Sequence, residues 1–152
     1  MDFGQAAELV EALRSKDETK AYQCFKLLEK ESSDTDHVYP FFDLFADMIE
    51  DENSYVRTRG LLLIAANARW DTENKIDELI DSYLKHIEDV KPITSRQCIK
   101  ALPSIVKYKP DFYDCICTAL EQANPGIYRD SMSSLVMRDI AEALASIRRE
   151  GR

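Results

Sequence analysis

The chain has 152 residues, of which 45% are hydrophobic and 32% are charged. This length fits one ordinary domain, and this composition is typical of a globular protein rather than a disordered one. Only 4 Gly and 5 Pro are present, which excludes collagen, low-complexity linkers and a turn-rich β-sandwich. The net charge of −8 argues against a protein that coats DNA or RNA.

Apolar residues recur at the three- and four-residue spacing of an amphipathic helix along nearly the whole chain. No segment shows the sustained alternation of apolar and polar residues that is typical of a half-buried strand. In chain order, the pattern predicts helices at residues 4–14, 19–31, 37–50, 54–70, 73–88, 92–107, 111–122 and 131–149.

Short polar or proline-containing links separate these helices. Asp, Asn and Ser side chains can cap a helix start, and proline costs little in the first helical turn. In chain order these signals are residues 34–36, Asn53 or Ser54, residues 71–72, Pro92, Pro110 and residues 124–126. Because no link is long enough to separate two domains, we expect a single domain spanning residues 1–152. Its antiparallel helix pairs would cover approximately residues 1–33, 34–70, 71–109 and 110–152.

The helix pairs repeat. A shift of 37 residues places Val56 on Ile93 and Arg59 on Arg96, and a shift of 38 residues places Cys98 on Val136. A helix-pair repeat of this length is typical of a stacked α-solenoid.

The run from Asp51 to Ile64, with Val56-Arg57 and Gly60-Leu61 inside it, resembles the D-x-x-V-R-x-x-A-x-x-A/L core of a HEAT repeat. The likeness is good for residues 36–70, fair for 72–108 and weak for the first and last pairs. Residues 58–111 are also similar to small uncharacterised bacterial HEAT-like proteins. This resemblance does not imply any particular activity.

The resemblance implies an all-α fold, a right-handed α–α superhelix of about four HEAT-like pairs. First helices would form its convex wall and second helices its concave wall. It also implies a protein-interaction scaffold with no catalytic site and no cofactor, although fold alone does not fix function.

Charge divides between the two sets of helices. Residues 34–52 hold seven acidic and no Lys or Arg side chains, whereas residues 90–109 hold five Lys or Arg and no acidic side chains. With the HEAT-like arrangement, this division implies an acidic convex face and a mildly basic concave face. A basic concave face would bind a protein or peptide partner of acidic character.

Four basic residues are the candidates for contacting that partner, because guanidinium groups bind carboxylates through two hydrogen bonds. These are Arg57, Arg59, Arg96 and Lys100. If they form a binding patch, they should lack neighbouring carboxylates. The alternative is a structural ladder, in which Arg57 pairs with Asp51 or Asp89 and Arg96 is held in the same way.

Three aromatic residues near the ends of helix pairs are further candidates, namely Tyr55, Trp70 and Tyr108. Large aromatic side chains are favoured at interfaces because they bury much area at little entropic cost. The alternative is that each packs over a seam between neighbouring pairs.

Motifs for catalysis, metal binding and phosphate binding are missing. Neither His lies near Cys at ligand spacing, and the Cys115-x-Cys117 sulfurs would point to different sides of a helix. We therefore expect no enzyme, no metal and no cofactor. Two alternatives stay open: a nucleic-acid-binding repeat protein, and an alkylpurine-glycosylase-like enzyme with Trp70, Asp71 and Arg69 in a groove. The acidic composition argues against both.

The sequence also bears on location. The N-terminus lacks the pattern of a signal peptide, and no apolar stretch is long enough to span a membrane. We expect a cytoplasmic protein with no membrane association and with free, reduced cysteines.

Two positions give sharp structural expectations. Ile64 should be fully buried, with Leu62 more exposed. Pro103 lies inside an otherwise continuous helical pattern, so we expect a kink or break between Ile99 and Pro103, because proline removes one helical hydrogen bond and crowds the preceding turn.

Overall fold

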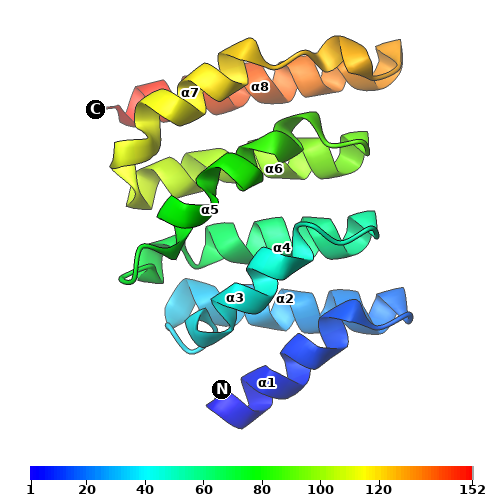
Figure 1. The fold of residues 1–152 in the computed structure, drawn as a ribbon, viewed down its shortest axis with the longest axis vertical. Coiled ribbons are helices and arrows are strands. Elements are labelled where there is room, and N and C mark those ends of the chain that lie inside the picture. The colour runs from blue at the N-terminus through cyan, green and yellow to red at the C-terminus, as the bar shows by residue number, and fades with distance from the viewer. Residues whose placement is uncertain (152) are drawn as a thin grey trace. The chain divides into compact units, whose positions relative to one another are not determined.

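The computed structural model describes residues 1–151, and in this range the protein is all-helical, without a β-strand. Short 3₁₀ turns extend or connect the α-helices, as is common at helix ends (Figure 1). The α-helices of the described range are α1 (Phe3–Glu11), α2 (Glu18–Asp34), α3 (Phe42–Met48), α4 (Ser54–Ala66), α5 (Lys75–Leu84), α6 (Pro92–Tyr108), α7 (Tyr113–Gln122) and α8 (Asp130–Glu150).

Each predicted helical segment overlaps one of these helices, so the all-helical secondary structure is confirmed. The predicted cap at Asn53 is present, since its side-chain oxygen accepts from the backbone N–H groups of Tyr55 and Val56. The carboxylate of Asp71 likewise accepts from the backbone N–H groups of Lys75 and Ile76, at 2.8 and 2.9 Å, at the start of α5.

The chain forms two compact units, which meet within α5. The first ends at Asp77 and the second begins at Glu78. The single domain expected from the sequence stays a prediction.

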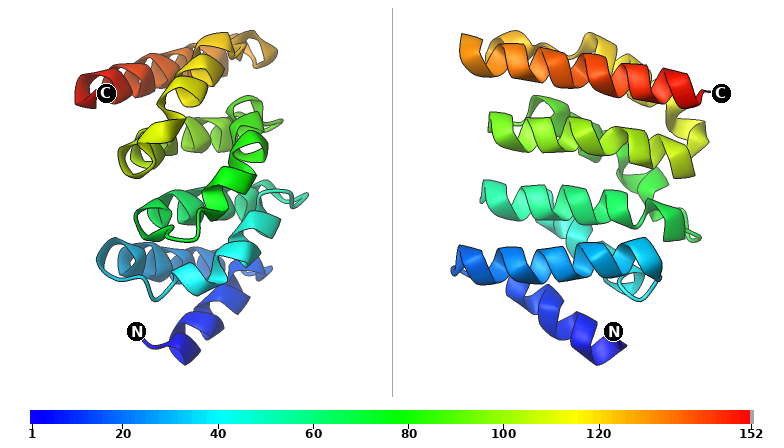
Figure 2. Two further views of the ribbon diagram at one scale, coloured as in Figure 1. Left: turned by 60° about the vertical axis from the view of Figure 1, so that its left-hand side comes forward. Right: turned by 180° about the vertical axis from the view of Figure 1, so that it is seen from behind.

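In the first unit, α1 packs against α2, and α3 packs against α4. The second members of these pairs, α2 and α4, also lie side by side (Figures 1 and 2). α3 and α4 approach each other closely at Gly60, where an added Cβ would lie 2.9 Å from the Cβ of Met48 and from the backbone oxygen of Phe45. Ile64 is fully buried and Leu62 is half-buried, as predicted.

In the second unit, α6 packs along α8, and α7 packs against both helices (Figure 2). Residues of α6 supply much of the buried apolar surface, including Ile99, Leu102 and Ile105. The break predicted near Pro103 is wrong, because α6 continues through this residue as one helix, whereas the alternative of a kink stays a prediction. Buried side chains on both sides of the proline anchor the helix, and this packing offsets the one hydrogen bond that proline cannot donate.

Of the two predicted repeat spacings, 37 and 38 residues, the pattern of burial fits 38 for the second and third helix pairs. A shift of 37 residues places Val56, which is buried, on Ile93, which is 58% exposed. A shift of 38 residues instead places Val56 on the buried Thr94 and Ile64 on the buried Leu102. A helix turns by about 100° per residue, so an error of one residue exchanges buried and exposed positions. Arg59 and Arg96 are therefore not equivalent positions.

Candidate interaction surface

Arg59, one of the candidates for binding an acidic partner, is 5% exposed in the first unit. It extends from α4 toward the start of α2, where one guanidinium nitrogen donates to the backbone oxygen of Leu13 at 2.9 Å. Another guanidinium nitrogen donates to the carboxylate of Glu18 and forms an ion pair with it. Arg59 therefore joins α4 to the α1–α2 connection.

Arg96 has a similar role in the second unit. Its Nε donates to Oδ2 of Asp139 at 2.6 Å, which joins α6 to α8. Asp139 is buried, and its hydrogen bond to the guanidinium is the main reason that the pKa of Arg96 is raised. Lys100 lies one turn further along α6 and is exposed.

Arg57 is also buried, and it donates to the backbone oxygens of Asp51 and Glu52 at 3.1 and 3.0 Å. These carbonyl groups belong to the link between α3 and α4. The side chain of Arg57 thus supplies hydrogen bonds to backbone groups outside the helical ladder.

These contacts contradict the expectation that the candidate cations lack neighbouring carboxylates. Arg59 and Arg96 each pair with a carboxylate supplied by another helix of the same unit. Arg57, Arg59 and Arg96 of the second helices are therefore engaged in internal contacts. This result agrees with the structural alternative for Arg96 and removes Arg59 from the exposed surface.

The aromatic candidates fall into different environments. Trp70 is half-buried and its Nε1 donates to the backbone oxygen of Ser32 at 2.7 Å, which connects it to the last turns of α2. The guanidinium of Arg69 lies 5.7 Å from the centre of the Trp70 ring. Tyr55 is 63% exposed at the start of α4. Tyr108 is half-buried, and the ammonium of Lys107 lies 5.4 Å from the centre of its ring.

The sequence did not single out the exposed apolar surface on α2. Tyr22 and Leu27 are 57% and 53% exposed, although the same helix buries Phe25 and Leu28 on its other side. Together with Gln23, Lys26, Glu29, Lys30 and Ser33, they line an open groove of about 790 Å³. We call this surface the α2 groove. Two large apolar side chains off the buried stripe of a helix are the sequence signal that could have found it.

Charge in the α2 groove is slightly positive. The ammonium of Lys26 donates to the carboxylate of Glu29 at 2.9 Å, and this hydrogen bond is the main reason that the pKa of Lys26 is raised. Lys30, on the next turn, adds a further exposed cation. The groove therefore offers apolar contact area beside a basic edge.

Buried polar groups near Trp70 fix the end of α4. The amide nitrogen of Asn67 donates to Ser32 Oγ at 3.1 Å and to the backbone oxygen of Leu63 at 2.9 Å. Ser32 Oγ in turn donates to the backbone oxygen of Leu28 at 2.8 Å. This chain of hydrogen bonds links α2 and α4.

Within residues 1–151, no group of three or more His, Cys, Asp and Glu side chains is arranged to hold a metal ion. The four cysteines are free, and burial raises the pKa of the Cys98 thiol, which disfavours its thiolate form. Among the helices in the described range, none is both long and apolar enough to cross a membrane.

Comparisons of the chain with protein-family models, with curated proteins and with solved structures find no match.

Proposed function

We propose that this protein is a non-enzymatic interaction module built from HEAT-like helix pairs, and that it binds a protein or peptide through its second helices. The HEAT-like core motif at residues 51–64 supports this proposal, as does the packing of α1 with α2 and of α3 with α4. The proposal includes the stacking of the pairs as a right-handed α–α superhelix, with the second helices on the concave side.

The observation that carries the proposal is the α2 groove. Tyr22 and Leu27 are large apolar side chains that remain more than half exposed on a helix with a well-packed opposite face. Burying such side chains against a partner contributes about 25 cal/mol for each Å² removed from water. Tyrosine is also among the residues most enriched in the energetically dominant positions of interfaces.

The preferred partner carries an apolar side chain beside an acidic residue. The apolar side chain would contact Tyr22 and Leu27, and the acidic residue would meet the ammonium of Lys30. Arg59 and Arg96 do not enter this proposal, since both already pair with carboxylates. The burial of Arg57 and Arg59 also favours a protein partner over a nucleic acid, because neither side chain lies where it could contact a phosphate backbone.

Two leucines of the first unit provide a matched test. Leu27 in the α2 groove is 53% exposed, and Leu44 on α3 is 48% exposed outside it. The wild-type chain, Leu27→Ser and Leu44→Ser are each used to capture partners from a lysate of the native host at physiological ionic strength. The captured protein is identified by mass spectrometry, and its affinity for each variant is measured by calorimetry.

We expect Leu27→Ser to raise the Kd by about tenfold or more, as is usual for an apolar anchor of an interface, and Leu44→Ser to change it by less than about twofold. Both variants change one exposed side chain, so both should fold like the wild type. Equal effects of the two substitutions, or no effect of Leu27→Ser, would contradict binding at the α2 groove.

A further inference from the structure

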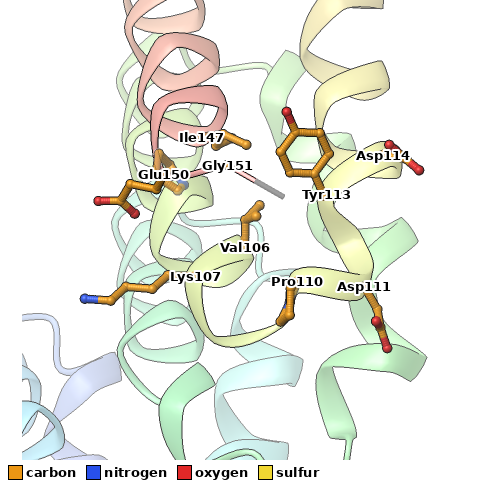
Figure 3. Close-up of a pocket in the computed structure, with 10 residues that line it drawn as sticks. Val106, Lys107, Pro110, Asp111, Tyr113, Asp114, Ile147, Glu150 and Gly151 are labelled. Atoms are coloured by element: carbon orange, nitrogen blue, oxygen red, sulfur yellow. The ribbon is translucent and has the colours of Figure 1, made fainter.

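The second unit contains a cavity of about 530 Å³, separate from the α2 groove. It lies between the C-terminal half of α6, the 3₁₀ turn η5 (Pro110–Phe112), the first turn of α7 and the end of α8 (Figure 3). Its volume falls within the range of about 300–1,000 Å³ that is usual for ligand pockets.

The cavity is lined by polar and apolar surface in similar measure, and four apolar or aromatic residues face its centre. Val106 of α6, Pro110 of η5, Tyr113 of α7 and Ile147 of α8 surround the central space in Figure 3. Val106 and Ile147 are part of the core of the unit, at 8% and 3% exposed. Because α6 and α8 carry these walls and pack along each other, the cavity has a rigid frame. An apolar side chain that entered it would exchange water for carbon contacts on several sides.

The edges of the cavity are mainly acidic. Asp111, Asp114 and Glu150 are exposed, and their carboxylates point away from the central space toward its edges (Figure 3). Lys107 supplies the single basic side chain among the lining residues of the described chain, and its ammonium lies 5.4 Å from the centre of the Tyr108 ring. The three carboxylates therefore give the mouth of the cavity a net negative charge.

We propose that this cavity is a second binding site, which takes a peptide segment with one large apolar side chain flanked by Lys or Arg. The apolar side chain occupies the space lined by Val106, Tyr113 and Ile147. The flanking cations lie beside the carboxylates at the edges, where they are attracted by charge and retain contact with water. This site selects the opposite charge from the α2 groove and does not depend on the function proposed for that groove.

The test uses synthetic peptides with blocked ends and the isotope-labelled full chain, followed through its amide NMR spectrum. The main probe is the hexapeptide Lys-Lys-Leu-Trp-Lys-Lys. One comparison peptide has Glu at each Lys position, and another has Gly and Ser in place of Leu and Trp. The main probe should cause saturable shifts at the amides of Val106, Tyr113 and Gly151. The two comparison peptides should bind at least about tenfold more weakly.

Paired variants separate a defined site from general attraction to an acidic protein. Asp111→Asn with Asp114→Asn removes two charges at the cavity edge. The control, Glu78→Gln with Glu142→Gln, removes two exposed charges that do not line the cavity. The first pair should raise the Kd of the main probe by about fivefold at low salt, and the control pair by less than about twofold. The amide spectra of both variants report directly on folding.

Several results would overturn the proposal. One is the absence of saturable shifts with the main probe, and another is a set of shifts centred on other residues. Equal binding of the peptide without Leu and Trp would show that an apolar side chain does not anchor the peptide in the cavity. Equal weakening by the two variant pairs would show that net charge alone attracts the peptide.

Discussion

Replacing Arg59 by methionine tests whether this residue is structural. The substitution keeps an apolar stem of similar length but removes the donors to the backbone oxygen of Leu13 and to the carboxylate of Glu18. Leu13 is fully buried, and a buried carbonyl group without a partner costs about 1–3 kcal/mol. The Glu18 side chain is 43% exposed, so water can solvate its carboxylate and the lost ion pair adds only about 0–1 kcal/mol. We expect Arg59→Met to lower the free energy of unfolding by about 2 kcal/mol.

The assay is urea unfolding followed by far-ultraviolet circular dichroism. Glu18→Gln is the matched control, because it keeps an oxygen acceptor and leaves the bond to Leu13 intact. It should cost less than about 1 kcal/mol. If Arg59→Met changed stability by less than about 0.5 kcal/mol, the buried contact with Leu13 would not stabilise the fold. If Glu18→Gln cost as much as Arg59→Met, the ion pair rather than the carbonyl contact would be responsible.

Three further predictions concern the first unit. Ile64→Ala should cost about 2–5 kcal/mol in urea unfolding, from lost burial and a cavity, and a change within error would contradict its place in the core. Gly60→Ala should cost about 1–3 kcal/mol, because its Cβ would lie 2.9 Å from the Cβ of Met48. A gain from Gly60→Ala, as in an exposed helix, would contradict the close approach. The pKa of Tyr39 is raised mainly by burial of its side chain and also by its hydrogen bond to Asp71. Its stabilising contribution is therefore complete below the unfolded-state pKa of about 10 and is lost as pH rises above that value. Unfolding measured at about pH 9 and pH 11 should show the cost of Tyr39→Phe shrinking at the higher pH, and a cost that grew would contradict this.

The positions of the helices were predictable because they depend on the local pattern of apolar and capping residues. Their apolar residues recur at helical spacing, and the cap at Asn53 involves groups only two or three residues apart. A helix break at Pro103 was a wrong prediction because the local cost of proline does not decide the outcome alone. The buried residues of α6 on either side of the proline keep the helix continuous, and their packing against α8 depends on residues far along the chain.

The charged contacts could not be assigned from the sequence in the same way. Arg59 meets Glu18 across 41 residues, and Arg96 meets Asp139 across 43 residues. A repeat length predicts that successive second helices lie near one another. Several carboxylates on a neighbouring helix could then pair with each arginine. Choosing among them requires the rotation of each helix about its axis, and our repeat spacing was wrong by one residue at this point.

The α2 groove was missed for a related reason. Leu27 looks like a core residue by type, but it lies outside the buried stripe of α2 that includes Leu28, which is fully buried. One residue along a helix is a rotation of about 100°, so type alone cannot separate these neighbours. The helical wheel defined by Ala21, Phe25 and Leu28 places Leu27 outside the buried stripe.

Binding of a partner at the α2 groove is tested most directly by site-specific photocrosslinking in the native host. A photoreactive benzoylphenylalanine is introduced as Leu27→benzoylphenylalanine or, as the control, Leu44→benzoylphenylalanine on α3. We expect a discrete covalent adduct with another protein from position 27 and none from position 44. An adduct formed only from position 44, or no adduct from position 27 while the wild-type chain still captures its partner, would contradict binding at the α2 groove.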